Sequence, residues 1–211
     1  MKHLVFLLTM LVTLSASGQN YYSNSQRSKT EKLFKLTDKQ KNDLKRAAES
    51  KVMRFQENCA LIAGDASYQD KTCNGGYVDV AMQDFLKDAK IEITSLDGKT
   101  SSRKPVRRYL LNLALLRKKR YRSINITSYN CAMVSNFVKD VNMSNRTGQE
   151  WYVGEVTVYQ QFNAVTKEGR TVHDTVKRTM KVYALRNQIY SNDGVEEWWD
   201  IKLDDITAKN I

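Results

Sequence analysis

The chain has 211 residues, of which 27% are charged and 9% aromatic, with a single proline. This composition is typical of a globular protein and excludes a collagen-like, proline-rich or low-complexity chain. The formal net charge of +11 at pH 7 favours acidic partners, such as anionic glycans, phosphorylated lipids or nucleic acids.

The start of the chain has the layout of a secretory signal. Lys2 lies just before an apolar run at 4–14, and small residues follow that run. We therefore expect a signal peptide at 1–18, cleaved near Gly18/Gln19, and a protein exported to the periplasm or the cell exterior. The run is too short for a bilayer, which takes about 20 residues, so we expect no membrane span. A buried or amphipathic helix is the alternative for this run.

Residues 19–30 show no apolar periodicity, and we expect them to form a flexible leader to a single domain at 31–211. Inside that domain, Thr37 and Gln40 have the spacing of a capping box. Apolar or small residues then recur every three or four positions until Gly64, which predicts one long helix ending there.

Shorter elements are predicted next. The pattern at 77–85 indicates a second helix, and Ile91 with Ile93 indicates a short strand. Pro105 is expected to open a third helix, because proline is favoured in the first turn. The expected inward stripe of this third helix is Val106, Tyr109, Leu110, Leu113 and Leu116.

The last ninety or so residues change from a helical period to strict alternation, which predicts strands of an antiparallel sheet. The predicted strands are 121–129, 151–162, 171–185 and 197–207. Glycine-containing turns are expected at 167–169 and 192–194. Helices followed by a run of strands indicate an α+β fold, in which the helices pack on one face of the sheet.

This order of elements carries a family resemblance. The stretches that match are Lys90-Ile-Glu-Ile-Thr94, Val106-Arg-Arg-Tyr-Leu110 and the closing Trp198-Trp-Asp-Ile-Lys-Leu-Asp-Asp-Ile206. Over about residues 38–211 the chain resembles the nuclear transport factor 2-like (cystatin-like) superfamily, in particular its exported Bacteroidetes members. The resemblance implies a cone-shaped half-barrel whose curved sheet wraps the first helix and leaves a pocket between them. It implies no single function, because such folds host enzymes, carriers and interaction modules.

Two charged residues fall on the apolar face of the strand at 171–185. Asp174 and Arg178 alternate in step with Val176 and Met180, so we expect both to point inward as candidate ligand-binding residues. They would lie about 13 Å apart along the strand, so each needs another partner or a ligand. The alternative is that both are solvated at a wet pocket mouth, and His173 is expected on the opposite, outer side.

Basic residues are densest around the third predicted helix. They are Arg103, Lys104, Arg107, Arg108, Arg117, Lys118, Lys119, Arg120 and Arg122. Interleaved with Tyr109 and Tyr121, they predict a surface for an anionic glycan, a lipid head group or an envelope protein. Nucleic acid is less favoured because the chain is expected to be exported. The competing interpretation is that cations at the end of a helix offset its dipole.

Three cysteines, Cys59, Cys73 and Cys131, are expected to meet an oxidising compartment. Cys59 with Cys73 is the candidate disulfide, and burial of reduced cysteines as small apolar groups is the alternative. Apart from His3 in the predicted signal, His173 is the only histidine, and the cysteines lack zinc-ligand spacing, so we expect neither a metal nor a cofactor.

The sequence therefore predicts a non-catalytic binding or assembly module that uses the cone pocket or the basic helix. One alternative is an isomerase or dehydratase type of enzyme, with Asp174 as acid or base and Arg178 orienting an anionic substrate. Another is a structural subunit of an envelope or secretion complex, pairing through strand edges, with a homodimer as its simplest form.

Overall fold

The computed structural model describes residues 36–64, 76–95, 99–129, 133–191 and 194–211. The chain divides into two units, 1–40 and 41–211. The predicted signal peptide and leader lie outside the described residues, so both stay predictions. In the first unit, the backbone N–H of Gln40 donates to the Thr37 hydroxyl at 3.2 Å, and Gln40 Oε1 accepts from the N–H of Thr37 at 2.9 Å. This reciprocal pair confirms the predicted capping box.

Four helices are present in the described residues, α2 (Asp38–Gly64), α3 (Gly76–Met82), α4 (Val106–Lys119) and α5 (Val141–Thr147). The predicted stripe of the first helix is confirmed, since its apolar residues from Leu44 to Ile62 are buried. On α4, Val106, Leu110 and Leu113 are buried. None of the helices in this part of the chain is long and apolar enough to cross a bilayer.

Within the described ranges, eight strands form one open sheet. They are β1 (Lys90–Thr94), β2 (Ser101–Pro105), β3 (Tyr121–Ser128), β4 (Met133–Val134), β5 (Val138–Lys139), β6 (Trp151–Thr166), β7 (Thr171–Ser191) and β8 (Gly194–Asn210). The strand order is β2-β1-β8-β7-β6-β3, and β4 and β5 also pair with β6. All pairs are antiparallel except β1 with β8, which are parallel. The α+β class is therefore confirmed.

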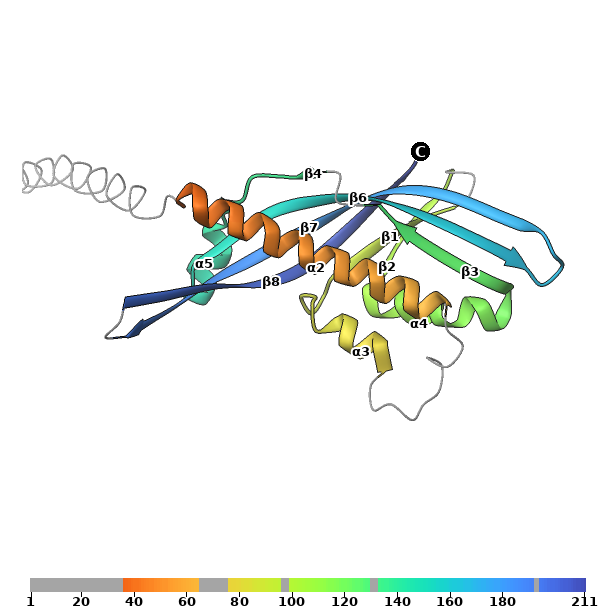
Figure 1. Cartoon of the computed structure of the whole chain (residues 1–211), viewed down its shortest axis with the longest axis horizontal. Coiled ribbons are helices and arrows are strands. Elements are labelled where there is room, and N and C mark those ends of the chain that lie inside the picture. Colours follow the sequence, from red (N-terminus) through yellow and green to blue (C-terminus); the bar gives the residue numbers. More distant parts are fainter. Residues whose placement is uncertain (1–35, 65–75, 96–98, 130–132, 192–193) are drawn as a thin grey trace, which may run out of the picture. The chain divides into compact units, whose positions relative to one another are not determined.

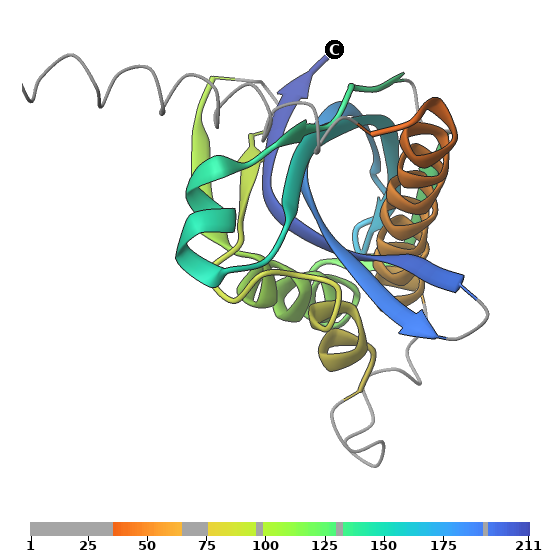
Figure 2. The same cartoon turned by 90° about the vertical axis from the view of Figure 1, so that its left-hand side faces the viewer.

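The two faces of the sheet have different partners (Figures 1 and 2). We call the face that carries Val156, Met180 and Leu203 the inner face; all three are fully buried. Both α2 and α4 lie on it, because Gln56 of α2 bonds to Gln160 of β6 and Tyr109 of α4 lies against Arg178 of β7.

On the opposite face, a smaller core joins the sheet to α5. Trp151, Tyr183 and Leu185 pack together with Leu86 and Met143. The rings of Trp151 and Tyr183 meet edge to face, with centroids 6.4 Å apart. The sheet is therefore covered on both faces where β6 begins, which the predicted one-sided packing did not include.

Candidate anion-binding sites

The strongest concentration of free positive charge lies where α4 ends and β3 begins. Lys167, in the turn between β6 and β7, joins it by donating from Nζ to the Lys118 carbonyl at 2.8 Å and from its backbone N–H to the Arg120 carbonyl at 3.1 Å. We call this cluster the basic end. Its members are Arg117, Lys118, Lys119, Arg120, Arg122, Lys167 and Arg170.

A bulge in β3 determines how the basic end is presented. Tyr121 pairs with Thr166 and Ser123 pairs with Val165, so Arg122 is the extra residue. Without the bulge, Arg122 would share the side of buried Ile124; with it, Arg122 is exposed. The bulge thus keeps this charge in solvent.

The nine predicted cations do not form one surface. Arg103 pairs with Asp205 at 2.6 Å and Arg107 pairs with Asp79, so these two are neutralised near the start of α4. Arg117 donates to the Gly64 carbonyl. Because a helix rises about 1.5 Å per residue, Arg107 and Arg117 lie about 15 Å apart. The prediction of one surface made by all nine cations is corrected, because Arg103 and Arg107 are paired with carboxylates, whereas Arg108 is exposed on α4 and the cations at 118–122 are exposed at and beyond its end.

The two interleaved tyrosines are half-buried, unlike the exposed cations around them. Tyr121 packs edge to face on Phe162, with ring centroids 5.7 Å apart. Tyr109 turns inward, and burial raises the pKa of its phenol to about 12 although the nearby Arg178 charge lowers it. Both rings therefore make contacts inside the protein, and their part in binding an anionic partner stays a prediction.

Arg178 lies at the centre of a buried polar chain on the inner face. It is 8% exposed, and its Nε donates to Gln160 Oε1 at 2.8 Å. Gln160 Nε2 donates to Gln56 Oε1 at 2.5 Å, and the Ser128 hydroxyl donates to that same oxygen at 2.9 Å. The guanidinium also lies 5.6 Å from the centroid of the Tyr109 ring.

Two buried donors of these hydrogen-bonded side chains have no partner among the described residues. They are Arg178 Nη1 and Gln56 Nε2. No carboxylate of the described residues pairs with Arg178 either. A buried cation without a counter-charge is costly, so an anionic group would be favoured beside Arg178.

Cys59 lies near Arg178. It is a free thiol, 1% exposed, and burial raises its pKa to about 12 although Arg178 lowers it. Its burial fits a packed, reduced cysteine, and the predicted Cys59–Cys73 disulfide stays a prediction. The proposed disulfide partner, Cys73, and the third cysteine, Cys131, lie outside the described residues.

Asp174 is half-buried on the same face as Arg178, opposite Phe162 of β6. Within the described ranges, no hydrogen bond or ion pair joins the two. His173 is exposed and meets Asn163 Oδ1 at 2.5 Å, on the outer side as expected. The structure therefore brings Asp174 and Arg178 to one face without pairing them.

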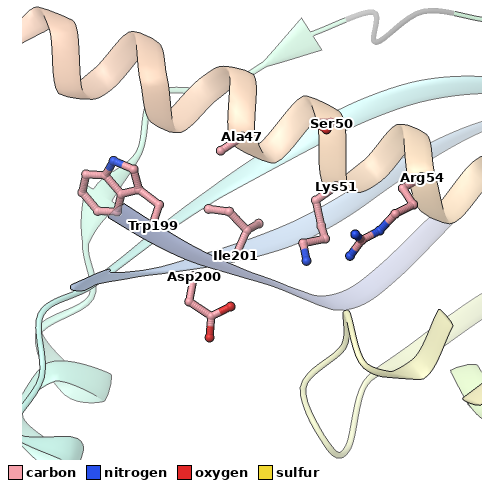
Figure 3. Close-up of a pocket in the computed structure, with 7 residues that line it drawn as sticks. All are labelled: Ala47, Ser50, Lys51, Arg54, Trp199, Asp200 and Ile201. Atoms are coloured by element: carbon pink, nitrogen blue, oxygen red, sulfur yellow. The ribbon is translucent and has the colours of Figure 1, made fainter. Parts of the chain in front are cut away.

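A groove lies between α2 and β8 (Figure 3), and none of its lining residues was among the predicted site residues. It encloses about 260 Å³ and is lined by Ala47, Ser50, Lys51, Arg54, Trp199, Asp200 and Ile201. Lys51 and Arg54 both reach the buried carboxylate of Asp84, with Lys51 Nζ and Arg54 Nε each at 2.9 Å. Local sequence patterns could not identify these lining residues, since the two walls are about 150 residues apart.

Its cations are largely offset by carboxylates. Asp84 accepts from both cations, and Asp200 in the lining pairs with Lys202 at 3.7 Å. The basic end differs in having a single carboxylate in its segments, Glu168. No group of three potential metal ligands occurs among the residues that the structure describes.

Comparisons with known proteins give no family for the chain. No family model matches it, and no curated protein matches it. Two solved structures are similar in backbone arrangement. The Kfla4162 protein from Kribbella flavida has 10% identity and a TM-score of 0.36, covering 78% of this chain and 91% of its own. A proposed aromatic ring hydroxylase from Novosphingobium aromaticivorans has 13% identity and a TM-score of 0.34, covering 78% and 90%.

Proposed function

We propose that the chain is an exported, non-catalytic binding module that holds an anionic partner on the basic end. One observation carries the proposal. Cations from two segments about fifty residues apart converge on one end of the molecule, and five of them have side chains without an ion pair or hydrogen bond among the described residues. Those five are Lys118, Lys119, Arg120, Arg122 and Arg170.

Helix stability alone does not explain this convergence. Arg117, Lys118 and Lys119 occupy the last turn of α4, where cations offset the negative end of the helix dipole. Arg120 and Arg122 lie beyond the helix, and Arg170 belongs to another element. Like charges held close together repel one another, so a partner that supplies several negative groups is favoured. Anionic glycans and anionic lipid head groups both have this chemistry.

The proposal is tested by measuring the affinity of the mature chain for fluorescein-labelled heparin, a soluble polyanion. Replacing Lys119, Arg120 and Arg122 with glutamate should weaken binding by about 100-fold, because each site changes from attraction to repulsion. The matched control replaces Arg46, Lys87 and Lys209, three exposed cations outside the basic end, by the same residue. Equal losses in both triple variants would show that only net charge matters and would overturn the proposal.

We further propose that the sheet and α2 form the cone-shaped half-barrel of the nuclear transport factor 2-like superfamily. The support is that two helices lie on one face of a largely antiparallel sheet, with Arg178 between them. In that fold the inner face is the place for a small ligand.

A second candidate function follows from the unpartnered Nη1 of Arg178. A small carboxylic acid that reaches the inner face would accept from this nitrogen, with Asp174 at the rim as the acid or base of the enzyme alternative. Neither the α2–β8 groove nor the smaller hollow at Lys41, Lys45, Asn136 and Phe137 is lined by Asp174 or Arg178. A thermal-shift screen against small carboxylic acids tests this candidate. A stabilising acid should have no effect on an Arg178→Met variant, and equal stabilisation of both proteins would contradict it.

A further inference from the structure

The outward face of α4 combines leucines with cations. Val106, Leu110 and Leu113 point toward the sheet, and at 100° per residue the opposite side is centred on Leu115 and Arg108. Leu111 is 47% exposed and Leu115 is 39% exposed. Arg107, Arg108, Asn112, Lys118 and Lys119 are the exposed residues around them, and of these Arg107 pairs with Asp79.

No carboxylate occurs anywhere in α4, from Val106 to Lys119. The helix thus has two apolar stripes. One is buried in the protein, and the other is exposed to solvent and flanked by cations. The basic end continues this face beyond the helix through Arg120 and Arg122. Leucines between cations are the pattern of a helix that lies in a membrane interface, where apolar side chains enter the acyl boundary and cations meet head groups.

We propose that the outward face of α4 docks on a membrane surface that contains anionic lipids. The inference rests on the proposed function and names the partner of the basic end. Leu111 and Leu115 enter the interface, while Arg108, Lys118, Lys119 and the rest of the basic end bind head-group phosphates. A soluble glycan would use the cations but would gain nothing from two exposed leucines, which is why the lipid surface is favoured.

The experiment is co-sedimentation of the mature chain with phosphatidylcholine vesicles, with and without phosphatidylglycerol. The wild type should bind only the vesicles that contain phosphatidylglycerol. Leu111→Gln with Leu115→Gln should weaken this binding by about tenfold or more, because two apolar side chains lose their burial. The same double variant should keep its affinity for labelled heparin within about twofold, since its charge is unchanged.

A matched control replaces Val138 and Ile189, which are 61% and 53% exposed on other elements, with glutamine. This control should bind vesicles as the wild type does. Full vesicle binding by the leucine variant, or equal binding of the wild type to phosphatidylcholine alone, would overturn the membrane inference. Heparin binding without any vesicle binding would overturn it too and leave the proposed function standing. If the wild type itself does not bind heparin, the proposed function is overturned instead.

Discussion

Arg178 occupies a position on β7 where an apolar residue would avoid a desolvation cost. Its neighbours in the strand on the same face, Val176 and Met180, are buried, and its charge has no carboxylate partner in the described part of the chain. The hydrogen bond to Gln160 and the contact with the Tyr109 ring recover part of that cost. A buried, unpaired cation is therefore retained at the expense of stability.

We accordingly expect Arg178→Met to raise the free energy of unfolding by about 1 kcal/mol, since methionine fills similar space without a charge. Urea denaturation monitored by tryptophan fluorescence measures this change. A loss of more than about 2 kcal/mol would show that the guanidinium stabilises the fold, and that no ligand is needed to explain it.

Cys59 should be inert in the folded protein. Its thiol is 1% exposed and burial raises its pKa to about 12, so almost none is present as thiolate at pH 8. We expect iodoacetamide at pH 8 to leave Cys59 unmodified until urea unfolds the chain, as read by peptide mass spectrometry. A peptide that links Cys59 to Cys73 in the non-reduced digest would contradict the free thiol.

Gly154 allows a close approach between β6 and the segment before β5. A Cβ at this position would lie 2.9 Å from the ring of Phe137. Gly154→Ala should therefore cost about 1–3 kcal/mol of unfolding free energy, because the ring must move from its packed position. Gly64→Ala is the matched control, since its added Cβ would meet only an ordinary contact at 3.8 Å. Equal stability of the two variants would show that Phe137 adapts freely.

At the scale of elements, Asp84 joins α2 to the segment between α3 and β1. Its side chain is 5% exposed, and Lys51 and Arg54 of α2 both donate to it. Asp84→Asn should lower the free energy of unfolding by about 2 kcal/mol, because Lys51 and Arg54 both lose their counter-charge while remaining partly hydrated. Asp43→Asn, an exposed position on the same helix, should be neutral. Thermal unfolding of the wild type and both variants measures these changes in stability. An equal effect of the two substitutions would contradict the role of Asp84.

The elements with a long, regular apolar pattern were predictable. The helix ending at Gly64, the helix after Pro105 and the long β6 and β7 were all confirmed, because each buries a stripe that repeats over several turns or pleats. Short elements carried no such signal. The strand at Ser101–Pro105 is polar. The start of α5 is fixed by its N-cap, in which the Asp140 side chain accepts from the N–H of Met143 at 2.8 Å.

Bulges were equally invisible in the sequence. In β8, Met180 pairs with Ile206 but Val182 pairs with Leu203, so Asp204 and Asp205 together oppose Lys181. Strict alternation would have placed Asp205 on the inner face. The bulge instead brings Ile206 inward, where it is fully buried. One extra residue thus reverses the side of every later residue, which no periodicity argument can anticipate.

At the scale of the whole molecule, the sequence located the cations but not their grouping. It placed nine basic residues in one surface, whereas tertiary contacts neutralise Arg103 and Arg107 and bring Lys167 to the end of α4. Long-range pairing of β3 with β6 creates the basic end, and pairing partners cannot be read from local patterns. The inward position of Arg178 agrees with alternation within a single strand, whereas its ligand-binding role stays a prediction.

The most direct measurement is residue-resolved mapping of anion binding by amide NMR of the mature chain during titration with heparin. The account predicts that the largest shift changes fall at 117–122 and 166–170, and that they disappear when salt screens the charges. Changes concentrated elsewhere, for example along the α2–β8 groove, would contradict the assignment of the basic end as the binding surface. So would the absence of any change at low salt.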